Sequence, residues 1–294
     1  MTKNNALYQH EKTTVSDMIC EITKKDIFLP PRNKFAHKGD FGRVLLICGS
    51  NKYTGAAYFA AQSAVNSGSG LVFLSIPDEI RPILGVKLNE PILISRSEVD
   101  MRCDAALIGC GIGLSDSSLS IVKNELSKDG PPLVIDADAI TLIAKNGLSL
   151  SSRRNLVLTP HEGEFLRLVP DFDSSRREEF AKNFAKKNGC ILVLKGHRTI
   201  TATPDGKLFV NTTGNPGMAK GGSGDVLAGI ITSLIGQGIP PHIAAYTAVW
   251  LHGRAGDIAA EKHGEYSMTP TDMLCALKSA ICEVSGTYES KKAP

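Results

Sequence analysis

The sequence predicts an α/β fold in which a mostly parallel central sheet carries helices on both faces. From Arg43 onward, short apolar runs alternate with segments long enough to form crossover helices, which is the pattern of parallel strands in βαβ units. No linker of suitable composition divides the chain. The sequence therefore predicts one domain over residues 26–288, preceded by an arm or docking helix at 1–25 and followed by a tail at 289–294.

Six apolar runs predict buried strands. Each run ends at a glycine, a proline or a polar residue, as expected for parallel strands that are covered on both faces. The runs are residues 44–48, 71–76, 105–108, 133–135, 156–158 and 191–194. Residues 199–203 and 207–210 flank Pro204-Asp205-Gly206, which predicts a β-hairpin added to the parallel sheet.

The strongest helical patterns lie after the first strand and in the last third of the chain. The Ala-rich segment 55–68 ends at Gly68, a suitable C-terminal stop. Residues 224–235 repeat apolar side chains with the period of an amphipathic helix. Two further helices are predicted near 241–262 and 271–284, the second opened by Pro270.

Composition excludes several classes of protein. The 294 residues include 33 Lys+Arg and 30 Asp+Glu, and the net charge of +3 is too weak to indicate a nucleic-acid or membrane partner. The N-terminus lacks the apolar core of a signal peptide, and no apolar run reaches the roughly 18 residues of a membrane span. The seven cysteines form no CxxC and the histidines no HExxH, so neither disulfides nor a transition-metal site is expected. We therefore expect a cytoplasmic protein.

Glycines and ionisable residues follow the predicted strands. Because ligands of open α/β sheets bind beyond the carboxyl ends of the strands, these residues mark the expected functional edge. They are Gly49-Ser50, Gly109-Cys110-Gly111, Asp136-Ala137-Asp138, Thr159-Pro160-His161 and Lys195-Gly196. Asp136 or Asp138 could help to hold a cation such as Mg²⁺, and a turn or cap role fits their position equally well.

The most informative segment, residues 211–225, runs directly into the helix predicted at 224–235. Its Gly221, Gly222 and Gly224 are expected to adopt positive φ and to let the backbone approach a ligand. Free N–H groups at a helix N-terminus bind phosphate, and a carboxylate beside them can accept a proton from an attacking hydroxyl. Asp225 is therefore the candidate general base, with a simple helix cap as the alternative. The Walker A, GxGxxG and protein-kinase patterns are absent.

Three more motifs accompany this loop, namely HKGDFGR at 37–43, TPHEGE at 159–164 and VLKG at 193–196. With them, the chain over about residues 30–285 closely resembles the ADP/ATP-dependent NAD(P)H-hydrate dehydratases of the ribokinase-like superfamily. The family's Gly-Thr-Gly-Asp appears as Gly222-Ser223-Gly224-Asp225, which keeps the hydroxyl. Its Gly-Pro-Gly appears as Gly109-Cys110-Gly111, which keeps both glycines.

The resemblance implies a ribokinase-like three-layer sandwich and a role in repairing nicotinamide cofactors. The expected substrate is the S-form of hydrated NADH or NADPH, which carries an unwanted ring hydroxyl. Phosphorylation of that hydroxyl by ADP, followed by elimination, would restore NADH or NADPH and give AMP and phosphate. We expect ADP rather than ATP as the phosphoryl donor, with Mg²⁺.

The resemblance also assigns residues by motif. Asp225 is the expected catalytic base. The nucleotide is expected at Lys195, Gly196, His197, Arg198, Thr199, Gly222, Ser223 and Gly224, with the hairpin as a wall of its pocket. The hydrate is expected at Ala56, Gly111, His161, Asn215 and Asp225. Two alternatives stay open: His161 could serve only as a helix start, and Lys195 could be only a solvated charge.

Family members often form homotetramers, so a homo-oligomer is expected. We expect no fused epimerase domain of the kind found in some relatives, and therefore a functional partnership with a separate NAD(P)H-hydrate epimerase. Two other functions remain open. One is a small-molecule alcohol kinase of the same superfamily, acting on a sugar, hydroxymethylpyrimidine or hydroxyethylthiazole. The other is a nucleotide sensor without catalytic activity.

Overall fold

A ten-stranded sheet organises the residues that the computed structural model describes, which are 19–99, 101–150, 153 and 155–285. Its order is β1-β10-β9-β8-β7-β6-β5-β2-β3-β4. Neighbouring strands are parallel except where β9 pairs with β8 and with β10. The strands are β1 (Ile19–Ile22), β2 (Arg43–Ile47), β3 (Leu71–Ile76), β4 (Ile92–Ser95), β5 (Ala105–Ile108), β6 (Leu133–Ile135), β7 (Leu156–Leu158), β8 (Ile191–Leu194), β9 (Ile200–Ala202) and β10 (Leu208–Asn211).

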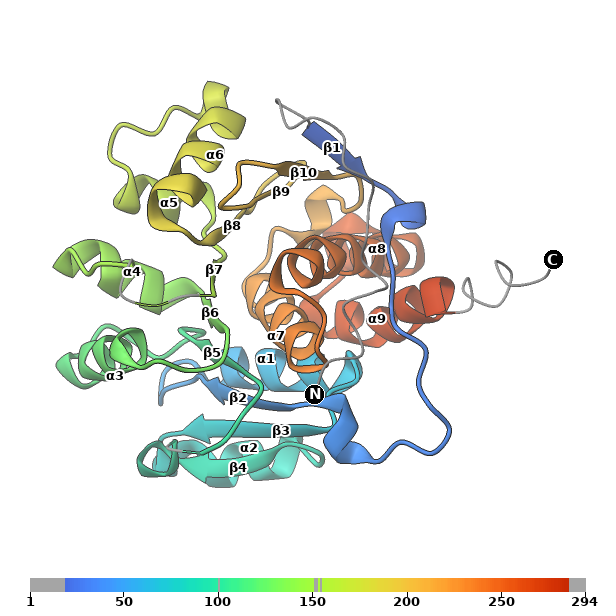
Figure 1. Cartoon of the computed structure of the whole chain (residues 1–294). Helices are drawn as coiled ribbons and strands as arrows, with labels where there is room; N and C mark the ends of the chain where they lie inside the picture. The colour runs from blue at the N-terminus through green and yellow to red at the C-terminus, as the bar shows by residue number, and fades with distance from the viewer. Residues whose placement is uncertain (1–18, 100, 151–152, 154, 286–294) are drawn as a thin grey trace.

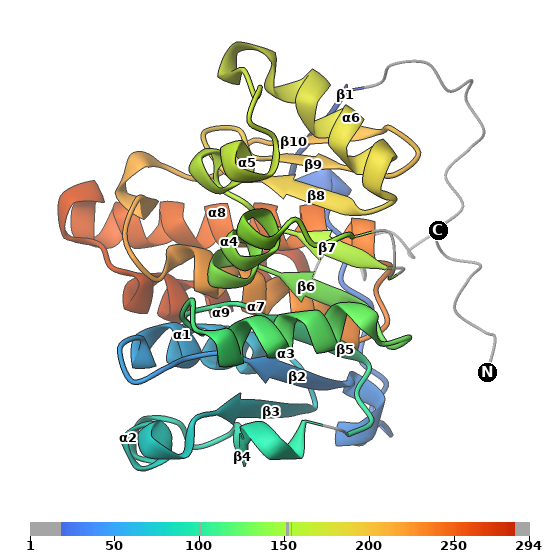
Figure 2. The same cartoon turned by 90° about the vertical axis from the view of Figure 1, so that its left-hand side faces the viewer.

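Helices cover both faces of this sheet and make a three-layer structure (Figure 1 and Figure 2). One face carries α3 (Asp116–Ser127), α4 (Ala137–Asn146), α5 (Glu162–Leu168) and α6 (Arg177–Asn188). The other face carries α1 (Thr54–Asn66), α7 (Ser223–Gly236), α8 (Pro241–Ser267) and α9 (Pro270–Ser285), and α2 (Arg81–Lys87) contacts α1. None of the helices in the described ranges combines the length and apolarity needed to span a bilayer.

Each face of the sheet has its own hydrophobic core, because successive strand residues point to opposite faces. Along β2, Val44 and Leu46 pack in the core that includes α1 and α7, whereas Leu45 and Ile47 pack in the core that includes α3 and α4. All four side chains are buried. This two-sided burial explains why β2 is a continuous apolar run rather than an alternating one.

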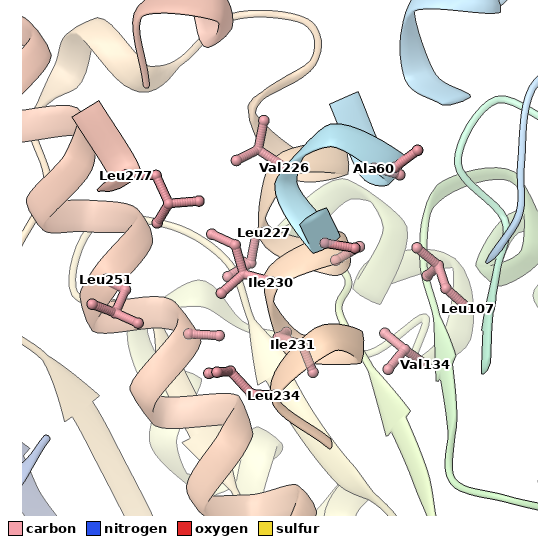
Figure 3. Close-up of a cluster of buried hydrophobic side chains, with 14 of the residues drawn as sticks. Ala60, Leu107, Val134, Val226, Leu227, Ile230, Ile231, Leu234, Leu251 and Leu277 are labelled. Atoms are coloured by element: carbon pink, nitrogen blue, oxygen red, sulfur yellow. The ribbon is translucent and has the colours of Figure 1, made fainter. Parts of the chain in front are cut away.

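Helix α7 lies at the centre of the first core. Its apolar side chains, including Val226 and Ile230, lie among those of α1, α8 and α9 (Figure 3). The two residues of α7 that are not fully buried are Gly224 and Asp225, in its first turn. The core therefore fixes the position of α7 and leaves its N-terminus open at the edge of the sheet.

The structure confirms the six predicted buried strands and the antiparallel hairpin of β9 and β10. The helices predicted at 55–68, 224–235 and 271–284 agree with α1, α7 and α9 within two residues at each end. Helix α8 extends five residues beyond its predicted end, to Ser267, with a non-helical Gly264 near that end.

Two edge strands were not predicted. β1 lies in the segment that was expected to be an arm, yet it pairs in parallel with β10, from Ile19 opposite Leu208 to Ile22 opposite Asn211. Ile22 is its one buried residue, and β4 has none, so neither strand has the continuous apolar run of a central strand. The arm prediction is therefore wrong for residues 19–22. Residues 1–18 and the predicted tail at 289–294 lie outside the described residues, and the domain limits stay predictions.

The contact between α1 and α7 predicts a specific sensitivity at Gly229. A Cβ atom there would lie 2.0 Å from the Ser63 hydroxyl oxygen and 2.2 Å from the Ala60 carbonyl oxygen. We expect Gly229→Ala to lower the free energy of unfolding by about 2 kcal/mol or more, because overpacking outweighs the gain in helix propensity. Urea denaturation measures this change.

Gly85 in α2 provides the control, because its added Cβ would meet nothing nearer than Leu93 Cδ1, at 3.8 Å. Gly85→Ala should raise the free energy of unfolding by about 0.5–1 kcal/mol through helix propensity alone. Equal stabilisation by both substitutions would contradict the tight packing of α7 on α1.

Candidate active site

Three side chains meet at the edge of the sheet where α7 begins. Cys110 follows β5, Asp136 follows β6 and Asp225 belongs to the first turn of α7. Their ligand atoms all lie within 4.8 Å of one another. Because β5 and β6 are parallel neighbours, the residues after them emerge side by side, and the buried body of α7 brings Asp225 to the same place. Cys110 and Asp136, two residues predicted at the functional edge of the sheet, therefore lie next to Asp225.

Lys195, at the end of β8, supplies the positive charge of this cluster. Its Nζ lies 2.7 Å from Oδ1 of Asp136 and 3.8 Å from Oε2 of Glu164. Burial acts to lower the pKa of Lys195, but the two carboxylates outweigh burial and the pKa is raised. The side chain is 18% exposed, so Lys195 is not simply a solvated charge. It is a partly accessible cation tied to a buried anion.

Asp225 differs electrostatically from an ordinary surface carboxylate. Burial and the nearby Asp136 carboxylate raise its pKa to about 7, although the Cys110 thiol and Lys195 act to lower it. The N-cap position of α7 belongs to Gly222, so the cap interpretation of Asp225 is wrong. A carboxyl group with a pKa near neutrality can accept and release a proton at physiological pH.

Of the three loop glycines that were predicted to adopt positive φ, one does so in the structure. Gly222 has φ of +105° and lies against the Phe59 ring, where an added Cβ would be 2.7 Å away. Gly221 and Gly224 do not adopt positive φ. Gly224 has a steric role instead, because an added Cβ would lie 3.3 Å from Lys195 Nζ. A side chain at this position would therefore crowd the lysine.

His161 begins helix α5, and its ring stays exposed; its contact with the hydrate stays a prediction. It is the N-cap of α5: its Nδ1 accepts the Glu164 N–H, while its own backbone N–H donates to Glu164 Oε2 at 2.9 Å. Its side chain is nevertheless 56% exposed. The backbone forms a parallel bridge to Lys195, whose N–H donates to the Pro160 carbonyl at 2.8 Å. His161 thus starts a helix and keeps an accessible ring beside the cluster.

Gly111 and Ala56, both expected to contact the hydrate, lie together. Gly111 has φ of +65°, and an added Cβ would lie 2.7 Å from the Cβ atoms of Ala56 and Tyr53. The turn after β5 therefore packs directly on the start of α1. Asp138 supports the same turn, because its Oδ2 accepts the Gly113 N–H at 2.8 Å.

Asn215 has a partner that the sequence did not reveal. Its side-chain amide donates to Oδ1 of Asp257 in α8 at 3.1 Å, and Oδ2 of Asp257 accepts the Gly214 N–H at 3.0 Å. Asp257 thereby anchors the loop before α7. A second residue of α8, His252, lies with its Nε2 2.8 Å from the Ser223 carbonyl oxygen. In the sequence, the polar residues within the Ala-rich part of α8 are the feature that could have indicated these contacts.

The segment 195–199 forms a compact loop between β8 and β9. Thr199 Oγ1 donates to the Gly196 carbonyl at 3.0 Å, and Arg198, at φ of +55°, forms an ion pair with Glu21 of β1. A narrow surface crevice, too small to hold a water molecule, lies beside the loop. Its lining comes from β1, the hairpin and α8: Ile22, Thr199, Thr201, Phe209, Asn211, Tyr246 and Val249.

Comparison with known proteins agrees with this fold. Among solved structures, a ribokinase-like superfamily protein from Enterococcus faecalis matches 94% of this chain and 99% of its own length, with a TM-score of 0.84 and 31% identity. An ADP/ATP-dependent NAD(P)H-hydrate dehydratase from Bacillus subtilis, co-crystallised with ATP and Mg²⁺, matches 90% and 99% with a TM-score of 0.81 and 28% identity. The fold and the site thus define a ribokinase-like α/β enzyme.

Sequence comparison identifies the family. The profile of the NAD(P)H-hydrate dehydratase family matches residues 44–279. An ADP-dependent (S)-NAD(P)H-hydrate dehydratase from Neisseria meningitidis is 35% identical over 243 residues, covering 79% of this chain and 82% of that protein. A bifunctional NAD(P)H-hydrate repair enzyme from Moorella thermoacetica is 39% identical over 266 residues, 84% of this chain but 50% of that protein. The chain belongs to the NAD(P)H-hydrate dehydratase family, and it spans about half the length of the bifunctional relatives that it matches.

The raised pKa of Asp225 predicts a pH-dependent stability difference. From pH 4 to 7, folded Asp225 keeps a proton that the unfolded chain has lost, so this group lowers the free energy of unfolding as the pH rises. Asp225→Asn removes the ionisation. Relative to the wild type, the variant should gain on the order of 2–4 kcal/mol at pH 8 and little at pH 4. Urea denaturation of the ligand-free protein at both pH values measures the difference.

Asp272 provides a control of opposite sign. Hydrogen bonds from the Thr269 hydroxyl and N–H lower the pKa of this carboxyl. Asp272→Asn should therefore destabilise the protein at pH 8. If Asp225→Asn also destabilises it there, the electrostatic description of Asp225 is wrong.

Proposed function

We propose that this protein dehydrates the S-form of hydrated NADH or NADPH and uses ADP as the phosphoryl donor. The observation that carries the proposal is Asp225, a carboxyl group with a pKa near 7 at the open N-terminus of α7. Lys195 lies beside it, and the chain belongs to a family named for this reaction. A base, a cation and a helix N-terminus together suit phosphoryl transfer to a hydroxyl.

In the first step, the substrate's ring hydroxyl attacks the terminal phosphoryl group of the nucleotide. Asp225 accepts the hydroxyl proton while a bond forms between the ring oxygen and phosphorus. The bond from phosphorus to the departing AMP oxygen breaks at the same time. Negative charge on the transferring group is stabilised by the N–H groups at the start of α7 and by Lys195.

In the second step, the phosphorylated ring eliminates phosphate. The ring C–O bond breaks and its electron pair leaves with the phosphate, which takes up the proton lost by the adjacent ring carbon as the ring double bond returns. The balance is one hydrate and one ADP giving one NAD(P)H, one AMP, one phosphate and the proton that Asp225 accepted and then releases to solvent. Phosphorylation matters because phosphate is a better leaving group than hydroxide, so the enzyme converts a poor leaving group before breaking the carbon bond.

Two groups of residues support separate positions for the two ligands. Lys195, the first residue of the loop 195–199, lies beside Gly224, which follows Gly222 and Ser223 at the start of α7. This arrangement suits a nucleotide lying from the loop to α7. Gly111 directly follows Cys110 of the cluster and packs on Ala56, and the exposed His161 ring caps the helix whose Glu164 approaches Lys195. We assign this side of the cluster, with the Asn215 turn, to the hydrate. These assignments are part of the proposal.

The donor and the metal are proposed from relatives and from the chemistry of the cluster. The Neisseria relative is named ADP-dependent, and the Bacillus structure was obtained with ATP and Mg²⁺. Mg²⁺ prefers oxygen ligands and accompanies phosphates. The candidate ligands are Asp136, which lies beside Asp225 but pairs with Lys195, and Asp138, whose Oδ2 accepts the Gly113 N–H. The ion would neutralise phosphate charge. A homo-oligomeric state and a partnership with a separate epimerase stay predictions.

The direct test is a turnover assay with hydrated NADH or NADPH and either ADP or ATP. We expect the absorbance of the reduced nicotinamide to return, faster with ADP than with ATP. Asp225→Asn should lower kcat by at least about 100-fold, because it removes the general base, and should leave ADP binding largely intact.

Lys145→Ala, at the exposed end of α4, serves as the control and should turn over normally. A stable phosphorylated product from a small alcohol, without hydrate turnover, would favour the kinase alternative. ADP binding with no turnover of any substrate would favour the nucleotide sensor.

A further inference from the structure

Arg177, the first residue of α6, contacts two segments to which the proposed function assigns different ligands. Its Nη1 donates to the His197 carbonyl at 2.8 Å, and its Nη2 to the Leu194 carbonyl at 3.5 Å. Its Nε lies 2.9 Å from Oε1 of Glu162. The side chain is 17% exposed. A planar guanidinium can bind several acceptors at once in a defined geometry, and here it joins the loop after β8 to the start of α5.

The nucleotide loop, residues 195–199, needs such an anchor. Arg198 has φ of +55°. Residues other than glycine rarely adopt this conformation, and surrounding contacts must maintain it. The carbonyl that Arg177 binds belongs to His197, directly before this residue. The guanidinium also lies over Gly196, where an added Cβ would be 2.7 Å from Nη2. Arg177 therefore holds the loop next to its least favourable backbone conformation.

The hydrate side is tied to the same guanidinium. Glu162 is the first residue of α5 and directly follows His161, the N-cap of that helix. The two segments already share a backbone contact, from the Lys195 N–H to the Pro160 carbonyl. Arg177 adds a second, side-chain connection a few residues away. Two connections resist the relative rotation that one alone would permit.

We propose that Arg177 is a positioning residue that clamps the nucleotide loop to the His161 turn. It fixes the nucleotide loop directly and the hydrate site through Glu162. The identities of the two ligands rest on the proposed function. The clamp itself predicts that losing Arg177 weakens nucleotide binding even where no turnover is measured.

The test compares Arg177→Met with Arg176→Met by calorimetric titration of ADP. Arg176 is the matched control, because it is the preceding residue, is exposed and pairs with Glu179 at 2.6 Å. We expect the Kd for ADP to rise about tenfold in Arg177→Met, since the charge-assisted contact to the His197 carbonyl of the loop and the one to Leu194 at the end of β8 are both lost, and to stay unchanged in Arg176→Met. Wild-type affinity in a folded Arg177→Met would overturn the clamp.

Two milder variants keep the test decisive if Arg177→Met does not fold. Arg177→Lys keeps the charge and loses the planar fork, so its Kd for ADP should rise about threefold. Glu162→Gln should raise the KM for the hydrate more than the Kd for ADP. A wild-type Kd in Arg177→Lys, or an unchanged KM in Glu162→Gln, would contradict the proposal.

Nucleotide binding separates this proposal from the proposed function. Wild-type protein that binds ADP but turns over no hydrate would contradict the function, and the effect of Arg177→Met on the Kd would still test the clamp. Wild-type protein that binds neither ADP nor ATP would overturn the clamp together with the assignment of the loop.

Discussion

An imbalance of charge at the start of α7 determines the chemistry of this site. Two carboxyl groups, Asp136 and Asp225, share the cluster with one ammonium group, and Lys195 lies 2.7 Å from Asp136. Asp136 is the better neutralised and is almost completely buried. Asp225 is left with a raised pKa, which equips it to exchange a proton at neutral pH. The three-layer fold is needed because these groups come from strand ends and a helix far apart in sequence.

The same construction explains how a protein with a net charge of only +3 would meet anionic ligands. The phosphate-binding capacity that we propose lies in the N-terminus of a buried helix and in one placed lysine. It needs no broad basic surface. The core holds α7 on all sides except its first turn, where Gly224 and Asp225 remain accessible. Helix α7 therefore contributes both to the hydrophobic core and, through its first turn, to the proposed active site.

Local patterns in the sequence were sufficient to predict the central strands, the hairpin, α7 and the position of Asp225 at the start of that helix. They were not sufficient where the signal is weak or lies in pairs of distant residues. The edge strands β1 and β4 are half-exposed and lack a continuous apolar run. The Lys195–Asp136 pair spans 59 residues and the Asn215–Asp257 pair 42, so only folding shows them. Gly224 was predicted to adopt positive φ, whereas in the structure it does not, and an added Cβ would instead lie 3.3 Å from Lys195 Nζ.

In the proposed reaction, the ring hydroxyl becomes a phosphate ester before its oxygen leaves the nicotinamide ring. The most direct measurement uses hydrated NADH with ¹⁸O in that hydroxyl, turned over with ADP in unlabelled water, and mass spectrometry of the phosphate released. We expect the phosphate to carry the ¹⁸O, because the ring oxygen bonds to phosphorus and the ring C–O bond then breaks. Unlabelled phosphate, with the ¹⁸O found in water, would contradict it.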